Sequence, residues 1–288
     1  MIIYKEKIVN FTNEIQAKRI FTFWEPAKSM PAYVKLCIET WRTFLPDYEV
    51  VVVDYSTLDK WLGKGFFDEI LYSDFSLPKQ ADAIRAGILY QHGGIWLDAD
   101  TIFTSSDIRK IFDIEADFVM INAHLAFIKA AMGVGGGHSY ILSHWVSRIK
   151  QRLRFYRVSR ILCRFINDEK YLITKKLMAK IKNWDFLGNA ILNKYLQTKY
   201  GYFKIDRDEI NALPETKYNG DLQNLVENYQ SFYFNNDFSV QVMKDTKGII
   251  LLHNSWTPRK FLVMNEREFL EQNNTLSSIL KTILQKES

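Results

Sequence analysis

The stretch Gly93-Gly94-Ile95-Trp96-Leu97-Asp98-Ala99-Asp100 decides the fold, because it predicts a turn, a short buried strand and then two carboxylates one residue apart. A helix predicted over Pro78–His92, with Ser76 as its N-cap, leads into this stretch and ends at the glycine pair. In an open α/β sheet, ligands bind beyond the carboxyl ends of the strands. The sequence therefore predicts a ligand site at Asp98 and Asp100.

The first half of the chain alternates short apolar strands with amphipathic helices. Strands are predicted over Arg19–Trp24, Glu49–Asp54 and Gly94–Leu97, and helices over Ala32–Phe44 and Pro78–His92. The second strand contains four consecutive valines, a pattern typical of a parallel strand that is buried on both faces. This βαβαβ rhythm predicts an α/β fold with a Rossmann-like mixed sheet flanked by helices.

The second half of the chain is less regular. Strands are predicted at Phe118–Ile121, Ala126–Ala131 and Gly248–Leu252, and helices at His138–Leu153, at Arg157–Lys182 as one or two segments, at Trp184–Thr198 and from about Glu266. A polar, Asn-rich region without a predicted element precedes the last strand. We find no repeat and no long linker, and expect one compact body.

Composition excludes several classes of protein. Of the 288 residues, 47% are hydrophobic and 15% aromatic, which excludes a disordered chain and a coiled coil. The two cysteines, Cys37 and Cys163, are too few for a disulfide scaffold or a four-thiolate zinc site, and their scarcity fits the cytosol. Met1–Lys18 lacks the apolar core of a signal peptide, and no run of 18 apolar residues follows. We therefore expect no membrane-spanning segment.

Positive charge is concentrated in one block, residues 148–182. This block holds twelve Lys and Arg against Asp168 and Glu169, a balance of 12 − 2 = +10, whereas the whole chain carries +5. Such segregation indicates an anionic partner. Arginines alternate there with residues such as Phe155, Ile161 and Phe165, a composition typical of an interfacial helix on anionic lipid. A solvated helix face is the alternative.

Asp98 and Asp100 repel one another unless a cation joins them. Mg²⁺ or Mn²⁺ accepts one or two carboxylates and completes its shell with water and diphosphate oxygens. For an isolated Asp-x-Asp, a solvated loop is the alternative.

Asp82 and Arg85 lie on one face of the preceding helix. They form either an intrahelical ion pair or a site in which Arg85 binds phosphate or sugar oxygens and Asp82 accepts hydrogen bonds from sugar hydroxyls.

These motifs together resemble a known family. Ala81–Arg85 followed by Gly93–Asp100 is similar in order and spacing to the core signature of DXD-containing sugar transferases of the GT32 type. This group includes capsular polysaccharide and Och1-like sugar transferases and is related to the glucosyltransferase domain of the large clostridial toxins. Arg19–Trp24 resembles the family's first strand, and His253–Trp256 resembles its closing motif. The resemblance covers roughly Ala17 to Trp256.

The resemblance implies a GT-A fold that binds a nucleotide sugar and transfers the sugar with retention of anomeric configuration. The expected arrangement is a single domain over 1–288 with an added helical, basic region that faces the acceptor or the membrane. Residues 1–135 would form the nucleotide-sugar-binding half, residues 136–260 the acceptor half with basic helices at 148–182, and residues 265–288 the C-terminal helix.

The resemblance also assigns a donor and metal site. Mn²⁺ or Mg²⁺ would be held by Asp98, Asp100 and His253, with Asp98 also contacting ribose or metal-bound water and His253 alternatively touching the diphosphate. The remaining contacts to a UDP-sugar would come from Trp24 on the uracil, Asp82 and Arg85 on the donor sugar and ribose side, Trp96 near the donor, and Ser255 and Trp256 closing over it.

Two further candidate residues lie beyond the basic block. Asp185 and Asn189 fall where the family places a Gly-Pro-type segment near the β-face of the sugar, although this chain has Gly188-Asn189 there. Helix N-capping is the alternative for Asp185. Asp185 and Asn189 join Asp82 and Arg85 as candidate catalytic residues.

The expected function is that of a metal-dependent retaining glycosyltransferase. It would move a hexose, galactose or glucose, from a UDP-sugar to a polyprenyl-diphosphate-linked oligosaccharide in bacterial capsule or lipopolysaccharide synthesis. The basic block would hold it on the inner face of the plasma membrane. One alternative is a toxin-like or effector transferase that glycosylates a protein side chain. Another is a nucleic-acid-binding module, which leaves the Asp-x-Asp stretch unexplained, so we expect no nucleic-acid partner.

Overall fold

The computed structural model describes residues 18–114, 116–121, 124–130, 139–165, 183, 185–196, 202–205, 221–245 and 248–284. These residues form two compact units. In its described part, the first unit comprises residues within 53–96 and 116–204, and the second comprises residues within 18–52, 97–114 and 205–284. Each unit has its own buried core and its own set of helices.

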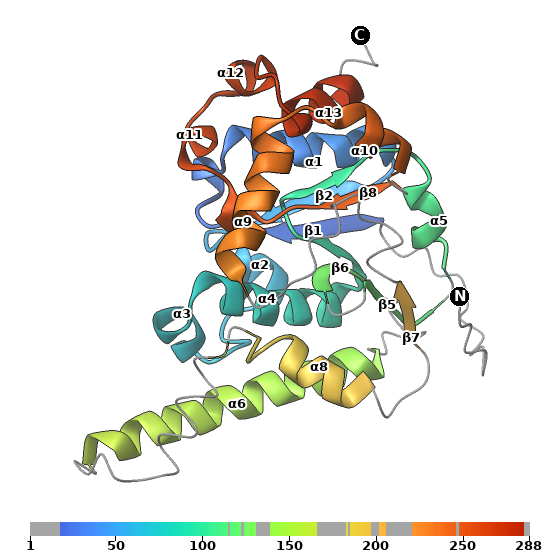
Figure 1. Cartoon of the computed structure of the whole chain (residues 1–288). Coiled ribbons are helices and arrows are strands. Elements are labelled where there is room, and N and C mark those ends of the chain that lie inside the picture. The colour runs from blue at the N-terminus through green and yellow to red at the C-terminus, as the bar shows by residue number, and fades with distance from the viewer. Residues whose placement is uncertain are drawn as a thin grey trace. The chain divides into compact units, whose positions relative to one another are not determined.

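In its described residues, the first unit combines a sheet with five helices. Its strands are hydrogen-bonded in the order β3-β6-β5-β7, and β5 runs antiparallel to β6 with Phe118 paired to Ala130. The long helix α6 packs against α3, α4 and α8 (Figure 1). The elements of this unit are α2 (Leu58–Leu62), α3 (Ile70–Asp74), α4 (Leu77–His92), β3 (Gly94–Leu97), β5 (Phe118–Ile121), β6 (His124–Ala130), α6 (Tyr140–Phe165), α8 (Asn189–Leu196) and β7 (Tyr202–Ile205).

The turn between α4 and β3 depends on two glycines. Gly93 and Gly94 have φ angles of 61° and 88°, in the left-handed region that side chains rarely adopt. The Gly93 N–H donates to the carbonyl of Leu89 and ends the helix, as predicted. Ser76 occupies the N-cap position, but its side chain makes no capping hydrogen bond. The predicted N-cap position and the helix itself are therefore confirmed.

The second unit is built around helix α1. The strands β1 and β2 are neighbours in one sheet, and β4 pairs antiparallel with β8. Helix α1 packs against β4 and against three helices near the C-terminus. The elements of this unit are β1 (Arg19–Phe23), η1 (Ala27–Ser29), α1 (Ala32–Phe44), β2 (Glu49–Val53), β4 (Thr101–Phe103), α5 (Ile108–Phe112), α9 (Leu222–Gln230), the π-helical turn η4 (Ser231–Asn235), α10 (Ser239–Asp245), β8 (Ile249–Leu251), η5 (Asn254–Trp256), α11 (Arg259–Leu262), α12 (Glu266–Leu270) and α13 (Thr275–Leu284).

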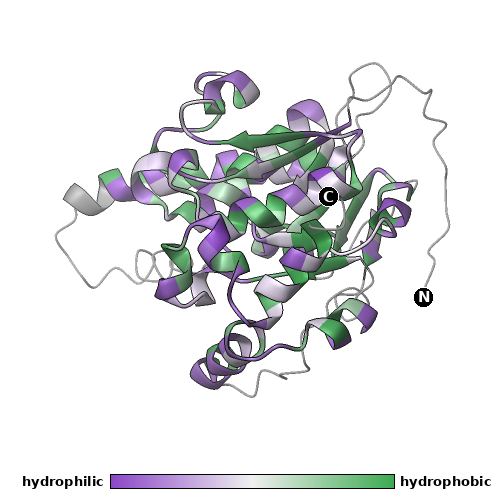
Figure 2. Cartoon of the chain, turned by 90° about the horizontal axis from the view of Figure 1, so that it is seen from above, coloured by the Kyte–Doolittle hydropathy of each residue, from purple (hydrophilic) through white to green (hydrophobic). Residues whose placement is uncertain are grey.

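Helix α1 fixes the strand that follows Asp100. The side chain of Trp41 is fully buried, and its indole N–H donates a 2.7 Å hydrogen bond to the Thr101 carbonyl. One turn of the helix also provides the Thr40 hydroxyl, which accepts from the Phe103 backbone N–H at 3.0 Å. Figure 2 shows the strands coloured mostly toward the hydrophobic end of the scale. The two hydrogen bonds from Trp41 and to Thr40 thus hold β4 against helix α1.

The predicted α/β class is confirmed, because helices and strands alternate along the chain and both units combine them. The five elements predicted in the first half are confirmed to within one residue. Their apolar periodicity is strong, and each is bounded by Gly, Pro or a polar turn. Among the described residues, no helix is both long and apolar enough to cross a bilayer.

Several predictions for the second half are wrong. Helix α6 runs without a break from Tyr140 to Phe165, where two separate helices were expected. Helix α8 begins at Asn189, after a turn over 185–188, and the predicted C-terminal helix is two helices, α12 and α13. The Asn-rich region contains α9, η4 and α10. Its Asn residues have weak helix propensity, and packing against α13 and η5 overrides it.

Candidate active site

The loop Asp98–Asp100 is held between β3 and β4 by backbone hydrogen bonds. The Thr101 N–H donates to the Asp98 carbonyl at 3.0 Å, which closes a tight turn. The Leu252 N–H donates to the Asp100 carbonyl at 3.3 Å, directly beyond the β4–β8 pairing in which Thr101 faces Leu251. The β4–β8 ladder therefore places the Asp-x-Asp loop beside the residues that follow β8.

The carboxylate of Asp100 is the most perturbed acid in this loop. Its Oδ2 accepts a 2.7 Å hydrogen bond from the Asn254 backbone N–H, which favours the charged form. Burial and then the negative charge of Asp98 act in the opposite direction and raise the pKa of Asp100 to about 7. Burial and the charge of Asp98 thus outweigh the stabilisation by the donated hydrogen bond. The oxygen ligands of Asp98 and Asp100 fit Mg²⁺ or Mn²⁺ by the chemistry of the donor set.

A buried tyrosine supports the loop that contacts Asp100. The Tyr33 hydroxyl of α1 donates to the side-chain carbonyl of Asn254 and lies 3.1 Å from the Thr257 hydroxyl. Burial, followed by the charge of Asp100, raises the pKa of Tyr33 far above its usual value, so the hydroxyl keeps its proton. Sequence reasoning missed Tyr33 and Thr257. Asn254 lay inside the quoted closing motif, but nothing in the sequence indicated that its backbone N–H is the group that binds Asp100.

The aromatic residues after β8 form a cluster of tilted and edge-on rings. The His253 ring lies 4.2 Å from the Trp256 ring, centre to centre, and both rings contact Tyr229 of α9. The His253 backbone N–H donates to the Tyr229 hydroxyl at 3.1 Å. Among the described residues, no three His, Cys, Asp or Glu side chains gather as a metal cluster, and His253 is therefore not preassembled with Asp98 and Asp100. Ser255 is exposed.

The two tryptophans predicted to contact the nucleotide, Trp24 and Trp256, are both half-buried. Trp24 follows β1 directly and is half-buried, so part of its indole remains accessible. Trp256 is likewise half-buried, and its carbonyl accepts a 2.8 Å hydrogen bond from the Gln230 side-chain amide. Both indoles keep a partly exposed surface on which a flat base can stack.

In the first unit, Asp82 and Arg85 form the intrahelical ion pair that was one of the two predicted alternatives. Their closest atoms are 3.6 Å apart, and both side chains are at least nine-tenths buried. The Arg85 guanidinium also donates a 2.6 Å hydrogen bond to the Leu125 carbonyl and lies 5.2 Å from the centre of the Trp96 ring. Trp96 is itself fully buried. The structure thus brings three of the predicted donor contacts together.

The turn before α8 packs directly on this pair. A Cβ on Gly188 would lie 2.3 Å from a carboxylate oxygen of Asp82, so only glycine fits at this position. Asn189, the first residue of α8, is buried beside it in the chain. Asp185 is not the N-cap of α8, and its buried Oδ1 has no hydrogen-bond partner in the described part of the chain. Trp184 lies outside the described residues.

The chain belongs to the family described as "Capsular polysaccharide synthesis protein", whose model matches residues 2–235. The resemblance to capsular polysaccharide enzymes is therefore confirmed at the level of the family. No curated protein matches the chain.

Three solved structures are similar to the chain. The apo form of the glycosyltransferase GlyE from Streptococcus pneumoniae TIGR4 has a TM-score of 0.38 and 12% identity over 94% of this chain and 64% of GlyE. A second GlyE structure has a TM-score of 0.35 and 11% identity over the same shares. The PaToxG glycosyltransferase has a TM-score of 0.32 and 14% identity over 61% of this chain and 78% of its own. The chain thus spans 64% of the length of GlyE.

Replacement of Asp100 by Asn is expected to change how stability depends on pH. The pKa of Asp100 in the folded chain, about 7, lies above the value of about 4 for an unfolded aspartate. Between these pH values the folded state keeps a proton that the unfolded state releases, so the free energy of unfolding falls as pH rises through this window. Asp100→Asn removes that fall and should be more stable than wild type above pH 7 by roughly 1–4 kcal/mol.

The measurement is thermal unfolding of both proteins over this pH range, in buffer with chelator. The exposed Asp245 on α10 offers a control, Asp245→Asn, with the same change of charge. A difference between Asp100→Asn and wild type that stays constant with pH would contradict the assignment.

Replacement of Gly188 by Ala tests the packing around Asp82. The added methyl group would overlap the Asp82 carboxylate and approach Leu125 Cδ1 at 2.7 Å, so we expect a loss of about 1–3 kcal/mol. The same substitution should cost less in an Asp82→Ala background, because one of the two clashing groups is gone. Urea unfolding of the four proteins of this cycle measures the coupling. Additive effects would show that Gly188 does not constrain Asp82.

Proposed function

We propose that the chain is a metal-dependent retaining glycosyltransferase that moves a hexose, galactose or glucose, from a UDP-sugar to a glycan acceptor. The observation that carries the proposal is the pair Asp98 and Asp100, two adjacent acids in a capsular polysaccharide synthesis protein, of which Asp100 has a pKa raised to about 7. Such a pair is unfavourable for stability and is suited to a divalent cation.

Asp98 and Asp100 would hold Mn²⁺ or Mg²⁺, which acts as a Lewis acid on the leaving diphosphate. Backbone donation from Asn254 orients Asp100, and the neutral hydroxyl of Tyr33 orients Asn254. In the proposal, His253 completes the metal shell or contacts the diphosphate only after its ring moves from Trp256, since the three side chains do not gather beforehand.

Four further residues of the second unit would bind the nucleotide, namely Trp24, Asp98, Ser255 and Trp256. The partly exposed indole of Trp24 is proposed to stack on the uracil, and Ser255 and Trp256 to close over the diphosphate. Ser255 is exposed, and the Trp256 carbonyl accepts a hydrogen bond from the Gln230 side chain. Asp98, which is half-buried, would contact ribose or metal-bound water.

Asp82, Arg85, Trp96, Asp185 and Asn189 stay proposed donor-sugar contacts. Because Asp82, Arg85 and Trp96 are buried, their proposed role is to hold a fixed pattern of charge and hydrogen-bonding groups rather than to reach into solvent. The buried carboxylate oxygen of Asp185 is an acceptor that a sugar hydroxyl could satisfy. Retention of configuration rests on the resemblance to the family.

The proposed acceptor is a polyprenyl-diphosphate-linked oligosaccharide in capsule or lipopolysaccharide synthesis. Such an acceptor is anchored in a bilayer, so the enzyme would act as a peripheral protein on the inner face of the plasma membrane. The positively charged block 148–182 supports this location through its charge. Residues 166–182 of the block lie outside the described residues.

The test is release of UDP from a panel of UDP-sugars, with Mn²⁺, with Mg²⁺ and with chelator, since slow hydrolysis of the donor needs no known acceptor. Wild type should release UDP from one donor only with metal, and Asp100→Ala should lower the rate by about 100-fold or more, because a metal ligand is lost. Asp245→Ala serves as the matched control, since it removes an exposed carboxylate elsewhere.

Two results would overturn the proposal. UDP release that persists in chelator would exclude the metal-dependent mechanism, and absence of both hydrolysis and UDP binding with every donor would exclude a UDP-sugar transferase. A protein acceptor that becomes glycosylated in place of a lipid-linked glycan would favour the toxin-like alternative.

A further inference from the structure

Helix α6 has no acidic residue, and its basic residues divide into two groups. The 26 residues from Tyr140 to Phe165 contain seven Lys and Arg. Three of the arginines face neighbouring elements of the first unit, whereas Arg148, Lys150 and Arg154 form no ion pair with the described residues. The side chain of Arg164 is not among those described.

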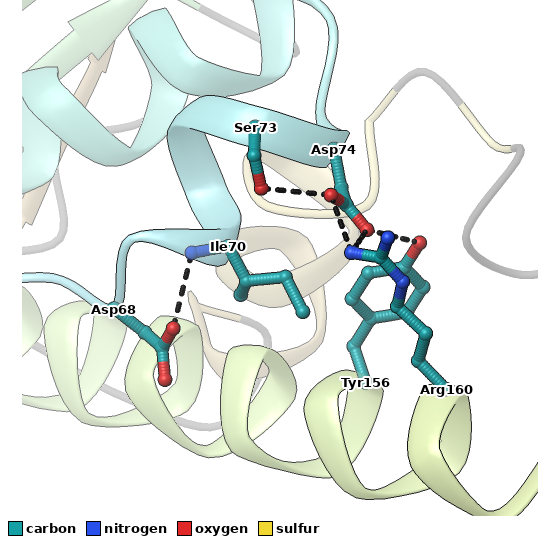
Figure 3. Close-up of polar contacts among 6 residues, drawn as sticks. All are labelled: Asp68, Ile70, Ser73, Asp74, Tyr156 and Arg160. Atoms are coloured by element: carbon teal, nitrogen blue, oxygen red, sulfur yellow. Dashed lines mark hydrogen bonds and ion pairs between the residues drawn. The ribbon is translucent and has the colours of Figure 1, made fainter.

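The first group holds α6 in place. Arg160 forms an ion pair of 2.5 Å with Asp74 at the end of α3, and the Tyr156 hydroxyl donates to the same carboxylate at 3.0 Å (Figure 3). Arg157 pairs with Asp68 at 3.0 Å. Arg152 donates to the Phe186 carbonyl and packs its guanidinium 4.9 Å from the centre of the Phe186 ring. These three arginines therefore fix α6 to neighbouring elements of the first unit.

The opposite face of α6 is apolar and exposed. Phe155, Val158 and Ile161 are 55%, 53% and 50% exposed. Their spacing of three residues places them along one side of the helix, away from the contacts to α3. Large apolar side chains on a helix without acidic residues are typical of a surface that lies in the interface of an anionic bilayer.

A basic hollow lies on the same helix. It has a volume of about 540 Å³ and is lined by Lys150 and Arg154, by Ser147 and Ser143 about one and two turns before Lys150, and by Tyr90 of α4. Among the described residues, no carboxylate lines it. Lys150 and Arg154 are like charges four residues apart, an arrangement that an anion between them would stabilise, and the Lys150 ammonium also lies 3.9 Å from the centre of the Phe66 ring. Hydroxyl groups and two cations suit a phosphate.

We propose that this outer face of α6 binds an anionic bilayer, with lipid phosphates in the hollow at Lys150 and Arg154 and the side chains of Phe155, Val158 and Ile161 in the headgroup region. The inference deepens the proposed function, because it places the enzyme where a lipid-linked acceptor is found. It assigns the membrane contact to Arg154 and its apolar neighbours and not to Arg152, Arg157 and Arg160. Half-exposed Val and Ile side chains favour lipid over nucleic acid, where flat rings would be expected.

The experiment is sedimentation of the full chain with phosphatidylcholine vesicles, with and without phosphatidylglycerol. Wild type should bind only the anionic vesicles. Lys150→Gln with Arg154→Gln should weaken partitioning by roughly 10-fold or more, because each basic residue near an anionic surface increases the affinity for that surface several-fold. Phe155→Ser with Val158→Ser should weaken it to a similar extent by removing the apolar contact.

The matched controls are Lys244→Gln with Arg259→Gln and Val240→Ser with Val263→Ser, which change exposed residues of the second unit. All variants should keep the thermal unfolding and the UDP release of wild type, so a loss of vesicle binding is separable from a failure of the proposed enzyme activity. Three outcomes would overturn the inference: no binding of wild type, equal losses in the controls, or tighter binding to single-stranded DNA than to anionic vesicles.

Discussion

The backbone N–H of Asn254 donates a 2.7 Å hydrogen bond to Asp100, and the rest of the candidate site depends on this contact between residues 154 positions apart. It requires the β4–β8 ladder, which brings the two segments together, and the Tyr33 hydroxyl, which holds the Asn254 side chain. One neutral donor does not offset burial and the charge of Asp98, so the pKa of Asp100 stays raised. In the proposed function, this acid pair is the feature of the loop that would bind a cation.

The first unit handles its buried charges differently. Asp82 and Arg85 neutralise one another within α4, and Arg85 has additional partners in the Leu125 carbonyl and the Trp96 ring. A buried pair with these extra contacts is stable only if its surroundings fit closely. Gly188 provides that fit, since any side chain at this position would overlap the Asp82 carboxylate. Glycine is therefore required here for packing and not for an unusual φ angle.

Helix α6 places its basic residues in two different surroundings. Asp68 and Asp74 pair with Arg157 and Arg160 and fix the helix to α3. Arg154 and its apolar neighbours Phe155 and Val158 lie on an exposed face. A count of charges treats these arginines alike. Their direction around the helix distinguishes them, because some form ion pairs within the unit and others face away from it.

The α/β class and the three strands and two helices predicted between Arg19 and Leu97 could be read from the sequence, because apolar periodicity and glycine turns are local signals. The short helices α2 and α3 in the same stretch were not predicted, and the ligand site at Asp98 and Asp100 stays a prediction. The sequence also determined the family through the order of its motifs. The continuous helix α6, the helices of the Asn-rich region and the roles of Tyr33, Thr257 and Gly188 were decided by tertiary structure. These features depend on contacts between residues far apart in the chain, and no local pattern records which distant segment supplies the partner.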